Sequence, residues 1–165
     1  MGTNYDAVAA LYNWLRTGTD ANAVAIQALV YSGTTGIWQQ ADLEQSTFAS
    51  LQIARNVAGQ RAKVLAISIH DLGEKVTGST IFQSVGICLW DKSNGQDALR
   101  LVREKVRYYI DKADDVGFTL DDVVTLDQGL LHLEYGGRTG YRQSEHYIAE
   151  YDLLTYTAIL VRDED

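Results

Sequence analysis

Proline is absent from this sequence of 165 residues, and cysteine occurs only once, as Cys88. A single cysteine excludes an internal disulfide. Its apolar surroundings in the stretch TIFQSVGICLW predict a small buried hydrophobe rather than a catalytic thiol. We therefore expect a chain that folds without covalent cross-links in a reducing cytoplasm. Without proline, we expect the turns to be formed by the 14 glycines and by Asn, Asp and Ser.

Long apolar runs and basic residues are scarce as well. No stretch reaches the ~18 apolar residues of a membrane-spanning helix, and the first residues, MGTNYDAVAALYNW, lack the pattern of a cleavable signal. We expect a soluble protein with no membrane partner. The 14 Lys and Arg against 22 Asp and Glu give a net charge of −8. This balance argues against a surface that grips a phosphate backbone, although DNA could still slide past it.

The clearest folding signal lies in residues 80–113, where an apolar strand and a polar turn lead into an amphipathic helix over 97–113. Ser93 and Gln96 have the spacing of a capping box at the helix start. Charged residues, Arg103 among them, fall on the side expected to face water. The apolar stripe recurs at three- and four-residue steps: Ala98, Val102, Val106, Tyr109, Ile110 and Ala113. A helix of this kind needs a sheet to pack on.

Further helices are expected before this signal. Residues 5–16 carry an apolar stripe that predicts an N-terminal helix. Residues 20–31 predict a second short helix, with a strand as the alternative because of their Val and Ile content. Residues 42–57 fit either a helix or an extended conformation.

Strands are expected on both sides of the central helix. Residues 63–69 are apolar on both faces, which places this strand centrally in a sheet, and residues 70–74 are expected to end it. A short loop then returns the chain antiparallel into the strand at 81–90, where Gly86 suggests a bulge or a close backbone approach. Residues 130–135 alternate between apolar and polar side chains, as in a half-buried strand.

The final strand, residues 147–161, is long enough to outrun its own sheet, and Glu150 and Asp152 are expected to face out. Together the elements predict a single α+β domain over residues 1–165 with a short acidic tail at 161–165. Its mainly antiparallel sheet of about four strands packs against the N-terminal helix and the central amphipathic helix.

Residues that could carry chemistry form no recognised motif. The histidines lack the spacing of a metal site, so we predict no metal, no cofactor and no catalytic residue. An enzyme is kept as an alternative, because His70 and Asp71 could orient a base and Cys88 could act as a thiol in a small hydrolase or transferase. No nucleophile turn of the GxSxG kind accompanies them, so a non-enzyme is preferred.

The glycine-rich stretch GGRTGYR, residues 136–142, is expected to form a loop at a hairpin tip. It contains no GxxxxGK and does not lead into a helix, so it lacks the features of a phosphate cradle. Its Arg138 and Arg142 could contact an acidic partner, although a plain flexible loop is preferred.

Two stretches carry a resemblance to a known family: VGICLWDKSNGQDALRLVREKVRYYI at 85–110 and YIAEYDLLTYTAILV at 147–161. The first has a strand, a W-[DS]-x-S-like turn and a helix of the type A-x-x-x-V/I-x-x-x-V. The second is similar to a long closing strand. In this order they resemble the tail terminator and tail-completion proteins of tailed bacteriophages, a small α+β family also called minor tail proteins.

The resemblance implies a virion protein of the tail or neck, assembled in the host cytoplasm. Its subunits would form a ring, usually a hexamer, at the head-proximal end of the tail, ending tail polymerisation and joining tail to head. Implied partners are further copies, a tail tube protein and a neck or connector protein, with DNA passing through without sequence-specific binding. Expected contact residues come from the glycine-rich loop and the closing strand: Gly136, Gly137, Arg138, Tyr141, Arg142, Tyr147 and Tyr151.

Two other non-enzymatic functions stay open at this point. The first is another component of the neck or head–tail connector. The second is a monomeric adaptor outside phages that binds protein partners through the long strand at 147–161, used as an exposed sheet edge.

Overall fold

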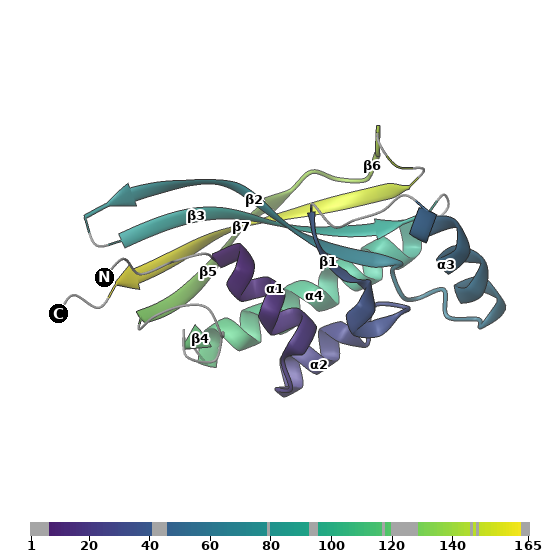
Figure 1. The fold of residues 1–165 in the computed structure, drawn as a ribbon, viewed down its shortest axis with the longest axis horizontal. Coiled ribbons are helices and arrows are strands. Elements are labelled where there is room, and N and C mark those ends of the chain that lie inside the picture. The colour runs from purple at the N-terminus through teal and green to yellow at the C-terminus, as the bar shows by residue number, and fades with distance from the viewer. Residues whose placement is uncertain are drawn as a thin grey trace.

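A computed structural model describes residues 7–40, 46–78, 80–92, 96–116, 118–119, 129–145, 147 and 149–162. It confirms the α+β class: one twisted, mostly antiparallel sheet carries α1, α2 and α4 on one face, while α3 stands at one end (Figure 1). Seven strands run in the order β1-β2-β3-β7-β5-β4, with β6 paired to β7 outside this path. Their bounds are β1 Ile37–Gln39, β2 Ala66–Thr77, β3 Thr80–Asp91, β4 Phe118–Thr119, β5 Gly129–Arg138, β6 Arg142–Gln143 and β7 Glu150–Arg162.

The four long strands β2, β3, β5 and β7 are the four that the sequence predicted. The other three are only two or three residues long and are paired to a long neighbour. All described strand pairings are antiparallel except that of β1 with β2.

Strand β2 departs from the prediction, because it does not end in residues 70–74 but continues to Thr77. A shift in its register with β3 between Asp71 and Glu74 absorbs the polar residues that suggested a loop. Gly73 adopts a φ of 113° there, and its N–H donates to Asp71 Oδ1 at 2.9 Å. The strand also lies next to the sheet edge, with only β1 beyond it, so the central position expected for it was wrong.

Strand β7 does not outrun its sheet. It pairs with β3 from Glu150 opposite Asp91 to Val161 opposite Thr80, and its other side pairs with β5 and β6. The longest expected strand is therefore an interior strand with hydrogen-bonding neighbours on both sides, and it offers no free edge.

The helices agree with the sequence. They are α1 Ala7–Thr17, α2 Ala21–Gln27, α3 Ser46–Val57 and α4 Gln96–Val116, with a 3₁₀ turn at Gly33–Gly36. The helical alternatives for 20–31 and 42–57 are the correct ones within the described residues. Asp20 explains the start of α2, because its carboxylate accepts from Ala23 N at 3.2 Å. The capping box expected for α4 includes Ser93, which lies outside the described residues.

Two apolar clusters lie on opposite faces of the sheet. The larger one fills the space between the sheet and α1, α2 and α4, and it includes the α4 stripe at Val102, Val106 and Ile110. The smaller one joins Phe48 of α3 to Cys88 and Trp90 of β3 on the other face. This position confirms that Cys88 is a buried hydrophobe, and burial raises its pKa well above the ordinary value.

Gly86 of β3 shows the close approach, not a bulge. A Cβ at this position would lie 2.7 Å from Leu153 Cδ1 and 3.3 Å from His70 Cβ. Because Gly86 has no side chain, the side chains of the neighbouring strands β2 and β7 can approach each other over β3.

Replacing Gly18 by alanine is expected to destabilise the protein by about 2–3 kcal/mol. The added Cβ would lie 2.2 Å from the carbonyl oxygen of Trp14, which accepts the Gly18 N–H at 2.9 Å, so the backbone between α1 and α2 must shift. Urea unfolding measures the loss. The matched control is Gly59→Ala, where φ is 72° and nothing lies within 4 Å of the Cβ, so only about 1 kcal/mol of backbone strain is expected. Equal losses in both variants would contradict the clash.

Candidate functional site

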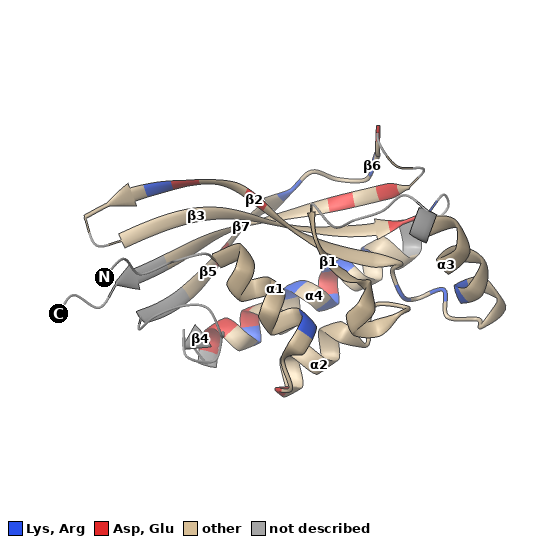
Figure 2. Ribbon diagram, in the orientation of Figure 1, with Lys and Arg blue, Asp and Glu red and all other residues tan. Residues whose placement is uncertain are grey.

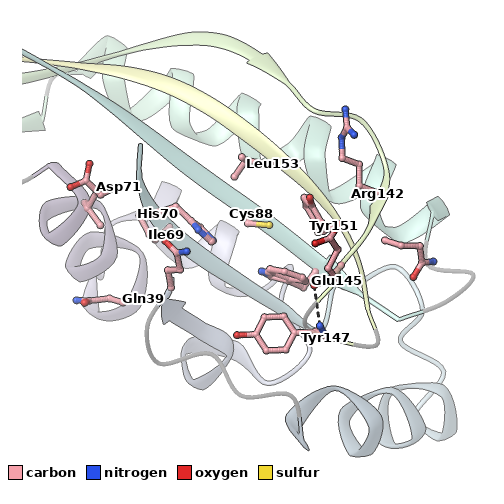
Figure 3. A pocket seen from close by; sticks show the side chains of 15 residues that line it. Gln39, Ile69, His70, Asp71, Cys88, Arg142, Glu145, Tyr147, Tyr151 and Leu153 are labelled. Atoms are coloured by element: carbon pink, nitrogen blue, oxygen red, sulfur yellow. Dashed lines mark hydrogen bonds between the residues drawn. The ribbon is translucent and has the colours of Figure 1, made fainter. Parts of the chain in front are cut away.

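A hollow of about 1080 Å³ opens on the sheet face that α1, α2 and α4 leave uncovered (Figure 3). Its floor comes from Cys88 of β3 and Leu153 of β7, and aromatic rings stand on one side. Polar side chains come from the end of β1, from β2 and from residues 142–145. The hollow thus combines an apolar base with a polar rim, the usual composition of a ligand or partner site.

The aromatic side of the hollow is built around Trp90. The Trp90 ring lies 5.1 Å from that of Tyr151 and 5.4 Å from that of Tyr147, the latter at an interplanar angle of 90°. Phe48 supports the group from α3, with its ring centroid 5.7 Å from both Trp90 and Tyr147. Edge-to-face and tilted contacts of this kind hold the rings in place.

The polar side of the hollow contains a hydrogen-bonded chain across two strands. Trp90 Nε1 donates to Ser68 Oγ at 2.7 Å, and Ser68 Oγ lies 2.6 Å from His70 Nε2. The two-residue period of β2 places Ser68 and His70 on one face. Burial lowers the pKa of His70, so the imidazole is neutral at pH 7.

Ser68 was missed in the sequence, where attention fell on His70 and Asp71. Both side chains line the hollow, but the Asp71 carboxylate accepts from the Gly73 backbone, and His70 Nε2 contacts Ser68 Oγ. Ser68 itself is fully buried, so its hydroxyl is closed to a substrate. The signal that could have found it is the alternation of Ser68 and His70 opposite Cys88 and Gly86 of the next strand.

The seven expected contact residues divide into two places. Arg142, Tyr147 and Tyr151 all line the hollow. The others lie along β5 and the turn after it: Gly136, Gly137, Arg138 and Tyr141. The glycines form a bulge within β5, where Gly137 has a φ of 134°, so 136–138 are strand and the predicted loop starts only at Thr139.

Arg138 has an acidic partner inside the chain. Its Nη1 lies 2.9 Å from Asp152 Oδ2, and Arg103 Nη1 of α4 lies 3.6 Å from the same oxygen. Tyr141 lies beside both guanidinium groups, with its ring centre 5.4 Å from Arg138 Cζ and 6.0 Å from Arg103 Cζ.

This cluster corrects two sequence expectations. Asp152 was expected to face out with Glu150 but is fully buried, and Arg103 was expected on the wet side of its helix but is only 9% exposed. Each group is kept inside by the opposite charge of the other. A buried pair of this kind cannot be read from the polarity of one element alone.

A second buried ion pair holds α3 in position near the hollow. Arg55 Nη1 lies 2.7 and 2.6 Å from the two carboxylate oxygens of Asp91 and also donates to the carbonyl oxygen of Lys63 at 2.9 Å. Burial raises the pKa of Asp91 above its ordinary value, although Arg55 acts in the opposite direction. The pair ties α3 to the end of β3, and thereby keeps Phe48 against Trp90.

Large apolar side chains are exposed on both sides of the domain. Leu72 and Phe82 stand on the uncovered face of the β2–β3 hairpin, 44% and 36% exposed. Leu101 and Tyr108 stand on the outer side of α4, 47% and 56% exposed. The spacing of seven residues puts these two on one side of the helix. We call the first pair the sheet patch and the second pair the helix patch.

No helix among the described residues is long and apolar enough to span a membrane. No group of three or more His, Cys, Asp or Glu side chains there is arranged to hold a metal ion.

A comparison with protein-family models found no match, and no curated protein matches the sequence. Among solved structures, a protein from Akkermansia muciniphila is similar over 96% of this chain and 79% of its own, with a TM-score of 0.38 and 9% sequence identity. A likeness this distant carries no argument, so the function has to be inferred from the residues and geometry of the chain itself.

Proposed function

We propose that the protein is a structural subunit of a homo-oligomeric ring, a tail terminator at the head-proximal end of a phage tail. The ring would end tail polymerisation and join tail to head. The phage assignment rests on the resemblance carried by residues 85–110 and 147–161. The observation that carries the ring is the presence of two different exposed apolar patches on opposite sides of one domain.

A closed ring needs two unlike patches per subunit, because each copy contacts one neighbour with one surface and the next neighbour with another. The sheet patch and the helix patch meet this requirement, since the sheet lies between them (Figure 1). In the ring, α4 of one copy lays Leu101 and Tyr108 across Leu72 and Phe82 of the next. Anchors spaced by seven residues are typical of a helix seated on an apolar surface.

The charge of the chain suits a ring through which DNA moves. The net charge is −8, and α4 carries acidic residues beside its basic ones (Figure 2). An excess of negative charge repels a phosphate backbone overall, so DNA would pass without sequence-specific binding.

The sheet edges are less suited to partners than the faces, which weighs against the edge-strand adaptor. The edge of β2 is interrupted by its bulge at 71–74 and by Asp71, which is bonded to the Gly73 N–H. On the opposite edge, Asp114 of α4 accepts the backbone N–H of Leu133 in β5 at 2.8 Å. Bulges and charged side chains of this kind discourage strand addition.

The test of the proposal is the mass of the purified protein by light scattering across a concentration series, with negative-stain imaging. We expect rings of about six subunits. Tyr108→Glu places a charge in the helix patch and should weaken assembly at least about 100-fold. Val57→Glu is the matched control, because Val57 is 85% exposed on α3 and lies outside both patches.

Each outcome decides something different. Rings that survive Tyr108→Glu would remove the proposed contact between α4 and the sheet while leaving the ring itself. A wild-type protein that stays monomeric and also fails to bind isolated tail tubes would overturn the terminator function.

A further inference from the structure

The hollow lies on the same sheet face as the sheet patch and adjoins it, because Leu72 of the patch and Leu153 of the hollow both approach Gly86. It lies toward the α3 end of the uncovered face, and its floor of Cys88 and Leu153 is apolar. The open space is larger than one side chain requires, and it continues past the rim toward the sheet edge at Gln39 and Asp71 (Figure 3). A ligand that fits this space therefore has one group that is buried in the hollow and a chain that leads out of the hollow.

The buried group is best matched by an aromatic ring. Trp90, Tyr147 and Tyr151 are already fixed by contacts with one another, so a further ring can join them without reordering them. Ring pairs in offset or edge-to-face geometry add binding energy beyond the area they bury. His70 also lines the hollow, and Ser68 Oγ links its imidazole to the Trp90 indole, so both rings are held in place before a ligand binds.

The rim favours a peptide chain. Gln39 and Gln40 stand at one end of the hollow, and amide side chains can both donate to and accept from a peptide backbone. A fatty chain would leave these amides unsatisfied. Among the described residues that line the hollow, Arg142 is the one Lys or Arg side chain, too few cations for a polyphosphate.

The charge of the rim selects among peptides. Asp71 and Glu145 outnumber Arg142, His70 is neutral, and the whole chain carries a net charge of −8. A basic residue beside the aromatic one would be attracted, and an acidic one repelled.

We propose that this hollow binds an extended segment of another protein, taking up one aromatic side chain that is flanked by basic residues. A second copy of this chain is a poor donor of such a segment. Its Tyr108 stands beside Arg107 but belongs to a helix, and its Tyr141 stands beside Arg142 next to the hollow and is packed against Arg103 and Arg138.

The test uses isotope-labelled protein and the capped peptides Lys-Trp-Lys, Lys-Ala-Lys and Glu-Trp-Glu, followed by NMR. We expect Lys-Trp-Lys to bind at least about tenfold more tightly than Lys-Ala-Lys. Glu-Trp-Glu should bind several-fold more weakly than Lys-Trp-Lys. The shifted signals should include the indole N–H of Trp90 and the imidazole of His70.

Variants separate the hollow from the helix patch. Tyr147→Ala should weaken Lys-Trp-Lys binding about tenfold, whereas Tyr108→Ala, on the far side of the sheet, should leave it unchanged. If Tyr147→Ala does not fold, the chemical-shift changes that Lys-Trp-Lys causes in the wild-type protein are sufficient to locate the binding site. Titrations with the Tyr108→Glu variant work whether or not rings form, so failure of the ring proposal leaves this test intact.

Three results would overturn the inference. They are shifts on α4 instead of around Trp90, equal binding of the Trp and Ala peptides, and tighter binding of a neutral disaccharide such as cellobiose, which would assign the hollow to sugars.

Discussion

Replacing Arg55 by methionine is expected to lower the free energy of unfolding at pH 7 by about 3–5 kcal/mol. The side chain is 4% exposed, and its removal leaves the fully buried carboxylate of Asp91 without its guanidinium partner. The Lys63 carbonyl also loses a donor. Urea unfolding followed by far-UV circular dichroism measures the change.

The loss should depend on pH in a direction that the structure fixes. Burial already raises the pKa of Asp91 in the folded state, so stability falls as pH rises from the unfolded pKa through the folded one. Without Arg55 two interactions that lower this pKa disappear, and the pKa rises further. The deficit of Arg55→Met should therefore shrink at about pH 5, where more of Asp91 is protonated.

The double variant Arg55→Met with Asp91→Asn provides the control. It removes the buried charge, and the asparagine oxygen can still accept from Lys92 N, which lies 2.7 Å from Asp91 Oδ1. At least half of the lost stability should return. Equal instability of the single and double variants would show that lost packing, not an unpaired charge, dominates.

Replacing Asp152 by alanine is the second change with a large expected effect, about 3–5 kcal/mol. The carboxylate is fully buried between two cations, and its loss leaves Arg103 and Arg138 close together without the negative charge that both approach. We expect the junction of α4 with the start of β7 to loosen first. Hydrogen exchange of the amides near residue 152 would detect this.

The matched control is Glu104→Gln. Glu104 also contacts Arg103, with 2.9 Å between Oε1 and Nη2, but its side chain is 60% exposed. An exposed pair of this kind contributes about 1 kcal/mol at most. Similar losses for Glu104→Gln and Asp152→Ala would contradict the view that burial of Asp152 sets its importance.

The parts of the fold that the sequence predicted are those with a local period. The stripe of α4 at Val102, Val106 and Ile110 is fully buried, as its spacing required. The alternation of Leu133 with His132 and Glu134 in β5 also holds, with Leu133 buried and the other two exposed. Each of these patterns depends only on which residues of one element share a face, so the sequence of that element is enough to predict it.

The predictions that were wrong concern residues whose environment depends on contacts between elements distant in the sequence. Asp152 and Arg103 were predicted to be exposed because the sequence pattern of each element does not show that the other residue lies next to it. The continuation of β2 past Ile69 depends on the hydrogen bond from the Gly73 backbone to Asp71, and on the pairing with β3.

The hollow itself was not predicted. Arg142 of the glycine-rich stretch and Tyr147 and Tyr151 of the closing strand were expected as ring contacts, and all three line the hollow. Ser68 and Trp90 were not expected there, because their meeting requires the register that sets Ser68 opposite Cys88 and Ala66 opposite Trp90. Such a register arises only when two strands are paired, so no single stretch of sequence displays it.

The interior position of β7 has a consequence for how the protein is made. Strands β3 and β5 cannot join into one sheet until β7 lies between them and pairs with both, and β7 follows both in the chain, so it leaves the ribosome after them. Until then the nascent chain carries a β2–β3 hairpin whose β3 side presents twelve residues without their partner. Unpaired strands of this length are prone to intermolecular pairing, so we expect the growing chain to be most prone to aggregation before β7 emerges.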